Sequence, residues 1–173
     1  MKKEKTFQSE FNKSCRALKN MHFYQIPNAP YSPNIIRRPI EKPYDCYCVH
    51  NGVFYGLELK VMGSNTFLFS KVKDHQVKYL MEVEENGGFG YLLINISLML
   101  TDTQKEKLGL EKCRINFIYY LRITDFIKMR EASNKKSIPL ASIIEDYKKN
   151  ENVISRKKFN EKFIGWDVGV IWK

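Results

Sequence analysis

The sequence predicts an α/β protein in which a mixed central β-sheet is flanked by helices. Three observations lead to this fold class. Helix-like and strand-like segments follow one another in the order helix, hairpin, helix, strand, strand, helix. The hairpin expected over residues 44–60 carries apolar side chains on both faces, which is typical of strands covered on both sides. A length of 173 residues with 43% hydrophobic residues suits a single domain, residues 1–173, with a core of its own.

The N-terminal part predicts a helix followed by an extended arm. Apolar residues recur at three- and four-residue steps from Phe7 to Leu18, which predicts a helix over residues 6–19 with Thr6 as its N-cap. Five of the six prolines lie in residues 27–43, and proline removes the amide hydrogen that a regular helix needs. We therefore expect an arm that projects from the domain at about 25–43.

The hairpin prediction rests on Asn51-Gly52, because both residues tolerate the positive φ angles of a two-residue type I′ turn. Counting back along the ladder from this turn sets Asp45 opposite Glu58. Side chains alternate between the two faces of a strand, so Asp45, Glu58 and Lys60 share one face.

The rest of the chain predicts further elements of both kinds. Ser70 is expected to cap a helix over residues 71–85, which two glycines at 87–88 end. Strands are expected over 89–96 and 114–121, and short helices over 123–130 and 140–149. Residues from about 150 to 173 are predicted to form a basic C-terminal tail.

The composition favours a polyanionic partner. Twenty-nine Lys and Arg residues against 19 Asp and Glu residues give a net charge of +10, and nucleic acid is the default partner for such an excess. The alternative is a basic protein with scattered surface lysines. The four cysteines show no zinc-ligand spacing, so we expect reduced thiols and a cytoplasmic protein. We find no signal peptide and no apolar run long enough for a membrane span.

Two carboxylates held opposite each other repel, so Asp45 and Glu58 need a positive group between them. A hard divalent cation with oxygen ligands meets that need and is suited to hydrolysis of a phosphodiester. Lys60 would orient the attacking water and stabilise the developing charge. Glu10, from the first helix, could complete the metal shell. The alternative readings are a solvated strand edge for Glu58-Leu59-Lys60 and a surface position for Glu10.

Asp45 together with Glu58-Leu59-Lys60 resembles the PD-(D/E)XK nuclease core, and in particular the RecU-type Holliday junction resolvases. Further stretches resemble that family in the same order, from about residue 10 to residue 139. They are residues 66–69, 75–76, 89–94, 119–121 and 136–139.

The resemblance implies a restriction-endonuclease-like fold and a Mg²⁺-dependent endonuclease of DNA recombination and repair, with Mn²⁺ able to substitute. It implies a homodimer that cuts four-way DNA junctions. In this chain the resemblance implies Asp45, Glu58 and Glu10 as metal ligands. It implies Lys60 as the catalytic lysine and Gln76 as a supporting residue on the second helix. DNA contacts are expected from Arg37, Arg38, Thr66, Lys71 and Lys73.

The chain departs from the family in its arm. The family's projecting stalk carries basic residues into the junction, whereas here Arg37 and Arg38 are the only candidates in a proline-rich segment. Ser70 stands near the place of the proline in the family's Thr-x-Phe-Pro block. Two alternatives to a junction resolvase therefore stay open. One is a restriction-like or repair nuclease acting on other DNA structures, and the other is a non-catalytic protein of this fold that binds or bridges strands.

Overall fold

The computed structural model describes residues 2–27, 41–132 and 136–172. Arg37, Arg38 and most of the predicted arm lie outside this part of the chain. The strands are β1 (Met21–Gln25), β2 (Cys46–His50), β3 (Val53–Met62), β4 (Thr66–Leu68), β5 (Phe89–Met99), β6 (Arg114–Arg122), β7 (Ser137–Pro139), β8 (Val153–Ile154), β9 (Arg156–Asn160) and β10 (Phe163–Trp166). The helices are α1 (Lys2–Arg16), α2 (Asp74–Glu85), α3 (Asp102–Lys107), α4 (Ile123–Ala132) and α5 (Leu140–Lys149), with 3₁₀ turns η1 (Phe69–Lys71) and η2 (Val168–Trp172).

The central sheet has six strands in the order β1-β2-β3-β5-β6-β8 and mixes both kinds of pairing. β3 and β5 run parallel, whereas the neighbouring pairs β1–β2, β2–β3, β5–β6 and β6–β8 are antiparallel. The parallel pair needs a crossover connection, and α2 lies in that crossover. The mixed sheet flanked by helices confirms the predicted fold class.

The β2–β3 hairpin has the register that the turn predicts. Asn51 and Gly52 adopt φ angles of 50° and 80°, both left-handed as a type I′ turn requires. His50 pairs with Val53, and the ladder continues to Cys46 opposite Leu57. The same count, continued by one residue beyond the ladder, sets Asp45 opposite Glu58.

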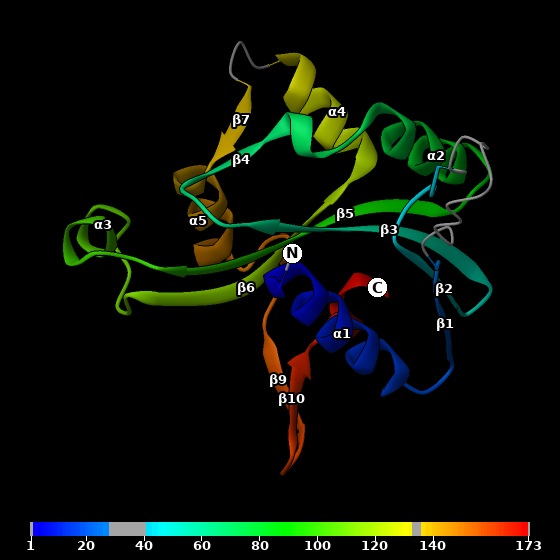
Figure 1. Ribbon diagram of the computed structural model, residues 1–173, viewed down its shortest axis with the longest axis horizontal. Coiled ribbons are helices and arrows are strands. Elements are labelled where there is room, and N and C mark those ends of the chain that lie inside the picture. Colours follow the sequence, from blue (N-terminus) through cyan, green and yellow to red (C-terminus); the bar gives the residue numbers. More distant parts are fainter. Residues whose placement is uncertain (1, 28–40, 133–135, 173) are drawn as a thin grey trace, which may run out of the picture.

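Two hydrophobic cores lie on the two faces of the sheet (Figure 1). α2, α4, α5 and the β4–β7 ribbon cover one face, where Leu80, Leu92 and Phe126 are fully buried. α1, η2 and the base of the β9–β10 hairpin cover the other, where Phe11, Leu59 and Trp166 are buried. Because side chains alternate, Leu57 and Leu59 enter the α1 core and Glu58 and Lys60 point to the α2 face.

Several elements differ from the sequence prediction at their ends. The first helix begins at Lys2, four residues before the predicted cap Thr6. Ser70 caps no helix, because it lies in the 3₁₀ turn η1 and α2 starts at Asp74 after Lys73. The predicted C-terminal tail is a folded part of the molecule: β8 joins the central sheet, β9 and β10 form a hairpin, and Trp166 and Trp172 are buried.

No helix in the described ranges is both long enough and apolar enough to span a bilayer.

We expect Gly90→Ala to lower the free energy of unfolding by about 1–3 kcal/mol, because overpacking a tight contact forces the backbone to move. A Cβ on Gly90 would lie 2.5 Å from the Leu80 carbonyl oxygen, so this glycine lets α2 sit directly on β5. Gly63→Ala is the matched control, since a Cβ there meets nothing within 4 Å. Denaturant unfolding of the two variants measures the difference, and equal stabilities would contradict the close approach of α2.

Candidate metal and catalytic site

Asp45 lies directly before β2, at the point where the β2–β3 ladder ends. Its carboxylate turns onto β3, where the main-chain N–H of Leu59 donates to Asp45 Oδ2 at 3.0 Å. Lys42 Nζ donates to the other oxygen, Oδ1, at 2.9 Å. The main-chain N–H of Asp45 itself donates to the Leu57 carbonyl at 3.1 Å. The Asp45 carboxylate therefore accepts the Leu59 N–H in place of a main-chain carbonyl, and this holds it against the strand that carries Glu58.

Glu58 is a carboxylate buried in the middle of the sheet, with 1% of its surface exposed. Lys60 Nζ and Gln76 Nε2 both lie 2.7 Å from its Oε1 atom. Within the described part of the chain, its Oε2 atom is buried without a hydrogen-bond partner. A buried ionised oxygen without a partner is costly, and such exceptions need a physical reason.

Gln76 connects α2 to the charged pair on β3. Its Nε2 donates to Glu58 Oε1, while its Oε1 accepts from Lys60 Nζ at 3.3 Å and from the main-chain N–H of Lys73 at 3.1 Å. Only one orientation of the amide serves a carboxylate on one side and two donors on the other. The first turn of α2 and the centre of β3 are thus held together by one side chain, in the supporting position predicted for Gln76.

Burial raises the pKa of the Glu58 carboxyl from 4.5 to about 7. Desolvation is the largest cause, and the nearby charge of Asp45 adds to it. Lys60 opposes the shift through its charge and hydrogen bond, and Lys42 through its charge. Asp45 Oδ2 accepts from the main-chain N–H of Leu59, the residue next to Glu58, so the two carboxyl groups lie near each other, as the register predicts.

The donor set fits Mg²⁺, which proteins usually hold through one or two carboxylates together with waters and substrate phosphates. The buried Oε2 atom of Glu58 supplies an oxygen with no other partner among the described residues. A cation placed between Glu58 and Asp45 would satisfy it and remove the repulsion between the two groups. These residues therefore suit a divalent cation.

Three of the residues predicted to contact DNA lie in the stretch of chain between β3 and α2. Lys71 and Lys73 are exposed in the link between β4 and α2, and Lys71 Nζ donates to the Val61 carbonyl of β3 at 3.3 Å. Thr66 is half-buried at the start of β4, where it pairs with Pro139. Arg37 and Arg38 lie outside the described residues.

The structure does not bring Glu10 to the pair. α1 packs on the opposite face of the sheet, and Glu10 Oε2 accepts from Arg156 Nη1 of β9 at 2.5 Å. In residues 2–27, 41–132 and 136–172, no three His, Cys, Asp or Glu residues form a cluster that could hold a metal ion. The role expected of Glu10 as a metal ligand therefore has no support in this arrangement.

Sequence reasoning missed three residues near Asp45. Glu4 and Gln8 of α1 line a cavity of about 280 Å³ with Lys42 and Asp45. Glu4 precedes Gln8 by four residues and so shares its helix face, a spacing that could have been recognised. It was missed because the helix was expected to begin at Thr6, which left Glu4 outside it.

No known family profile matches the sequence, and no curated protein matches it. Among solved structures, the chain is similar to Hjc, a Holliday junction resolvase from the archaeal hyperthermophile Archaeoglobus fulgidus, with a TM-score of 0.44 and 11% identity over 81% of this chain and 98% of that one.

The raised pKa of Glu58 predicts how stability without metal depends on pH. The folded state keeps this proton to about pH 7, whereas an unfolded glutamate loses it near 4.5, so the free energy of unfolding falls between these values. The loss amounts to about 3 kcal/mol at about 1.4 kcal/mol per pKa unit. Urea unfolding in EDTA at pH 5 and pH 8 should show this loss in the wild type and not in Glu58→Gln.

Glu85→Gln, at the exposed end of α2, is the control and should keep the wild-type pH dependence. If Glu58→Gln and the wild type lost the same stability between the two pH values, Glu58 would not be the titrating group.

Proposed function

We propose that this protein is a Mg²⁺-dependent DNA endonuclease that cuts branched DNA, with the four-way junction as its substrate. The observation that carries the proposal is the buried Glu58, which lies beside Asp45, Lys60 and Gln76 and has one oxygen without a hydrogen-bond partner among the described residues. A purely structural position would more readily take an apolar residue, because burying a carboxylate without full pairing costs free energy.

Asp45 and Glu58 would hold the cation, which Mn²⁺ could replace. Such a cation polarises a phosphoryl oxygen and lowers the pKa of a bound water. Lys60 has its ammonium group 2.7 Å from Glu58 Oε1 and is placed to stabilise negative charge on a phosphate bound there. Gln76 holds Lys60 and Glu58 in fixed relative positions, since it bonds to both.

The charge of the chain supports DNA as the substrate. The net charge of +10 favours a polyanion. Lys71 and Lys73 are exposed, and the main-chain N–H of Lys73 bonds to Gln76, which contacts Glu58. Lysines at such positions contact phosphates and set the position of a backbone without reading its sequence. This favours selection by DNA shape over selection by base sequence.

The four-way junction and the homodimer are proposed from the sequence resemblance to RecU-type resolvases. A junction offers two equivalent scissile phosphates, which a dimer with twofold symmetry can cut in matched positions. A non-catalytic strand-bridging protein is disfavoured, because opposed carboxylates facing DNA would weaken binding without serving any purpose.

We expect the wild type to cut a synthetic four-way junction in Mg²⁺ or Mn²⁺ and to leave it intact in EDTA. Linear duplex and a simple fork, assayed in parallel, measure the selectivity for branched DNA. Faster cleavage of linear duplex than of the junction would show that ordinary duplex DNA, and not the junction, is the substrate. Junction binding without cleavage of any of the three DNAs would overturn the enzyme assignment.

Asp45→Asn and Lys60→Ala should each lower the cleavage rate by about a hundredfold or more, since each removes a group that acts on the reacting phosphate. Junction affinity, measured by fluorescence anisotropy in EDTA, should stay close to that of the wild type. Lys128→Ala is the matched control for charge, because Lys128 is an exposed lysine on α4, and it should retain cleavage. Loss of binding in both site variants would show that these residues are structural.

A further inference from the structure

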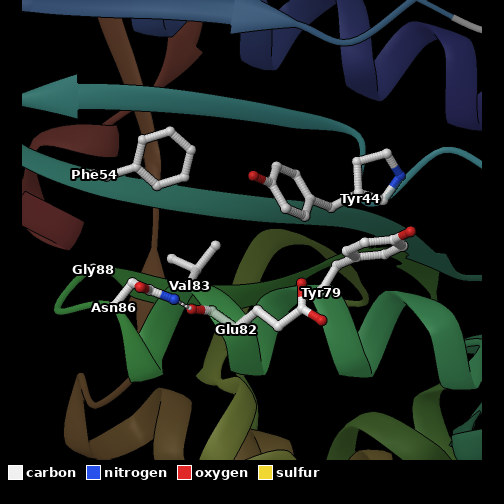
Figure 2. A pocket seen from close by; sticks show the side chains of 8 residues that line it. Tyr44, Phe54, Tyr79, Glu82, Val83, Asn86 and Gly88 are labelled. Atoms are coloured by element: carbon white, nitrogen blue, oxygen red, sulfur yellow. Dashed lines mark hydrogen bonds between the residues drawn. The ribbon is translucent and has the colours of Figure 1, made fainter.

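An aromatic cavity of about 400 Å³ lies between the β2–β3 hairpin and α2 (Figure 2). Tyr44 and Phe54 line it from the hairpin side, and Tyr79, Glu82 and Val83 line it from α2. Tyr79 is 37% exposed, so one ring of the cavity is open to solvent. The volume is ample for one planar ring system.

The lining selects against a phosphate. Three aromatic rings and the carboxylate of Glu82 line this space. No cationic side chain is among its described lining residues, and Lys78 Nζ lies 3.9 Å from Glu82 Oε1 on the exposed side of α2. An anion would meet repulsion there, whereas a neutral planar ring can stack on tyrosine and phenylalanine. A nucleobase is such a ring, and its exocyclic amino group could donate to the Glu82 carboxylate.

The elements that line the cavity also carry residues of the candidate metal site. Tyr44 directly precedes Asp45, and Tyr79 lies one helical turn after Gln76. On β3, Phe54 and Glu58 are four residues apart, which is about 13 Å at a rise of about 3.3 Å per residue. That span equals about four nucleotides of stacked strand at about 3.4 Å each, and fewer in an extended strand.

A row of neighbouring aromatic rings extends from the cavity to the edge of the sheet. The Phe54 ring stacks on Tyr47 with centroids 5.2 Å apart, and Tyr47 lies 5.4 Å from Tyr24 at an interplanar angle of 34°. Tyr24, on edge strand β1, is 46% exposed. Aromatic rings in such a row bind bases without sequence preference, because every base has a π-face.

We propose that this cavity binds an unpaired nucleobase of the strand whose backbone occupies the site formed by Asp45 and Glu58. The inference rests on the proposed function for its substrate class and adds a reason for branch selectivity. In a continuous duplex every base is paired and stacked, so none is free to enter. A fork supplies an unpaired base directly. At the crossover of a four-way junction a base pair has lost part of its stacking and opens at lower cost than a pair within a duplex, so the cavity then favours branched DNA.

An abasic-site scan in EDTA tests the base site without requiring cleavage. A fork with a short single-stranded arm carries one abasic position at a time, moved stepwise across the branch point. Wild-type affinity should fall about tenfold at one position within about four nucleotides of the branch point and little elsewhere, because base–aromatic stacking contributes that much to binding.

Tyr79→Ala should lose this dependence, so that the intact and abasic forks bind it equally well. Tyr147→Ala removes a tyrosine of the same 37% exposure from α5 and should keep the full tenfold effect. Tyr79→Leu, which retains apolar volume without an aromatic face, should behave as Tyr79→Ala does and serves in its place if the alanine variant does not fold.

The base site would be overturned if no abasic position changed the affinity of the wild type for the fork. It would also be overturned if both Tyr79 variants kept the full abasic effect. If Tyr79→Ala instead changed the oligomeric state in sedimentation while the scan stayed flat, the cavity would be a contact with a second copy of the chain. A base-dependent scan in a protein that cuts no DNA would support the base site while removing the nuclease assignment.

Discussion

The burial of the Glu58 carboxylate beside Asp45 is the constraint on which the site depends. One oxygen of Glu58 is satisfied by Lys60 and Gln76, and the other has no partner among the described residues. Desolvation and the neighbouring charge together raise the Glu58 pKa to about 7, and a cation bound beside Glu58 would offset both effects. The same arrangement therefore predicts weaker stability at high pH and a preference for a divalent ion.

The sheet topology produces this arrangement. The parallel pairing of β3 with β5 requires a crossover, and α2 in that crossover delivers Gln76 to the face of β3 that carries Glu58. Gly56 and Gly90 allow the close approach, since a Cβ on Gly56 would lie 3.2 Å from both Leu80 and Val83 of α2. The continuation of α2 toward Asn86 then forms one wall of the aromatic cavity, so the metal site and the proposed base site share the same two elements.

The parts that the sequence predicted well are those with a strong local signal. Asn51-Gly52 fixed the turn, and the two-residue alternation of a strand then set Asp45 against Glu58 without further information. Helix ends give a weaker signal. The predicted cap at Thr6 excludes Glu4, and Glu10, predicted to complete the metal shell, instead pairs with Arg156. The sequence predicts a tail where the structure has the β9–β10 hairpin, because the lysines of β9 obscure its alternation. The contact of this hairpin with α1, where Ser14 Oγ accepts from the Trp166 amide, joins residues 152 positions apart and has no local signal.

Anomalous diffraction from crystals grown with Mn²⁺ tests the metal site most directly. The predicted result is a manganese peak bound by carboxylate oxygens of both Asp45 and Glu58, with Lys60 and Gln76 still in contact with Glu58. A peak bound by Asp45 and Glu4 without Glu58, or the absence of any peak beside Glu58 at saturating Mn²⁺, would contradict the central claim. In that case the buried carboxylate would be a structural group, kept neutral by its own proton.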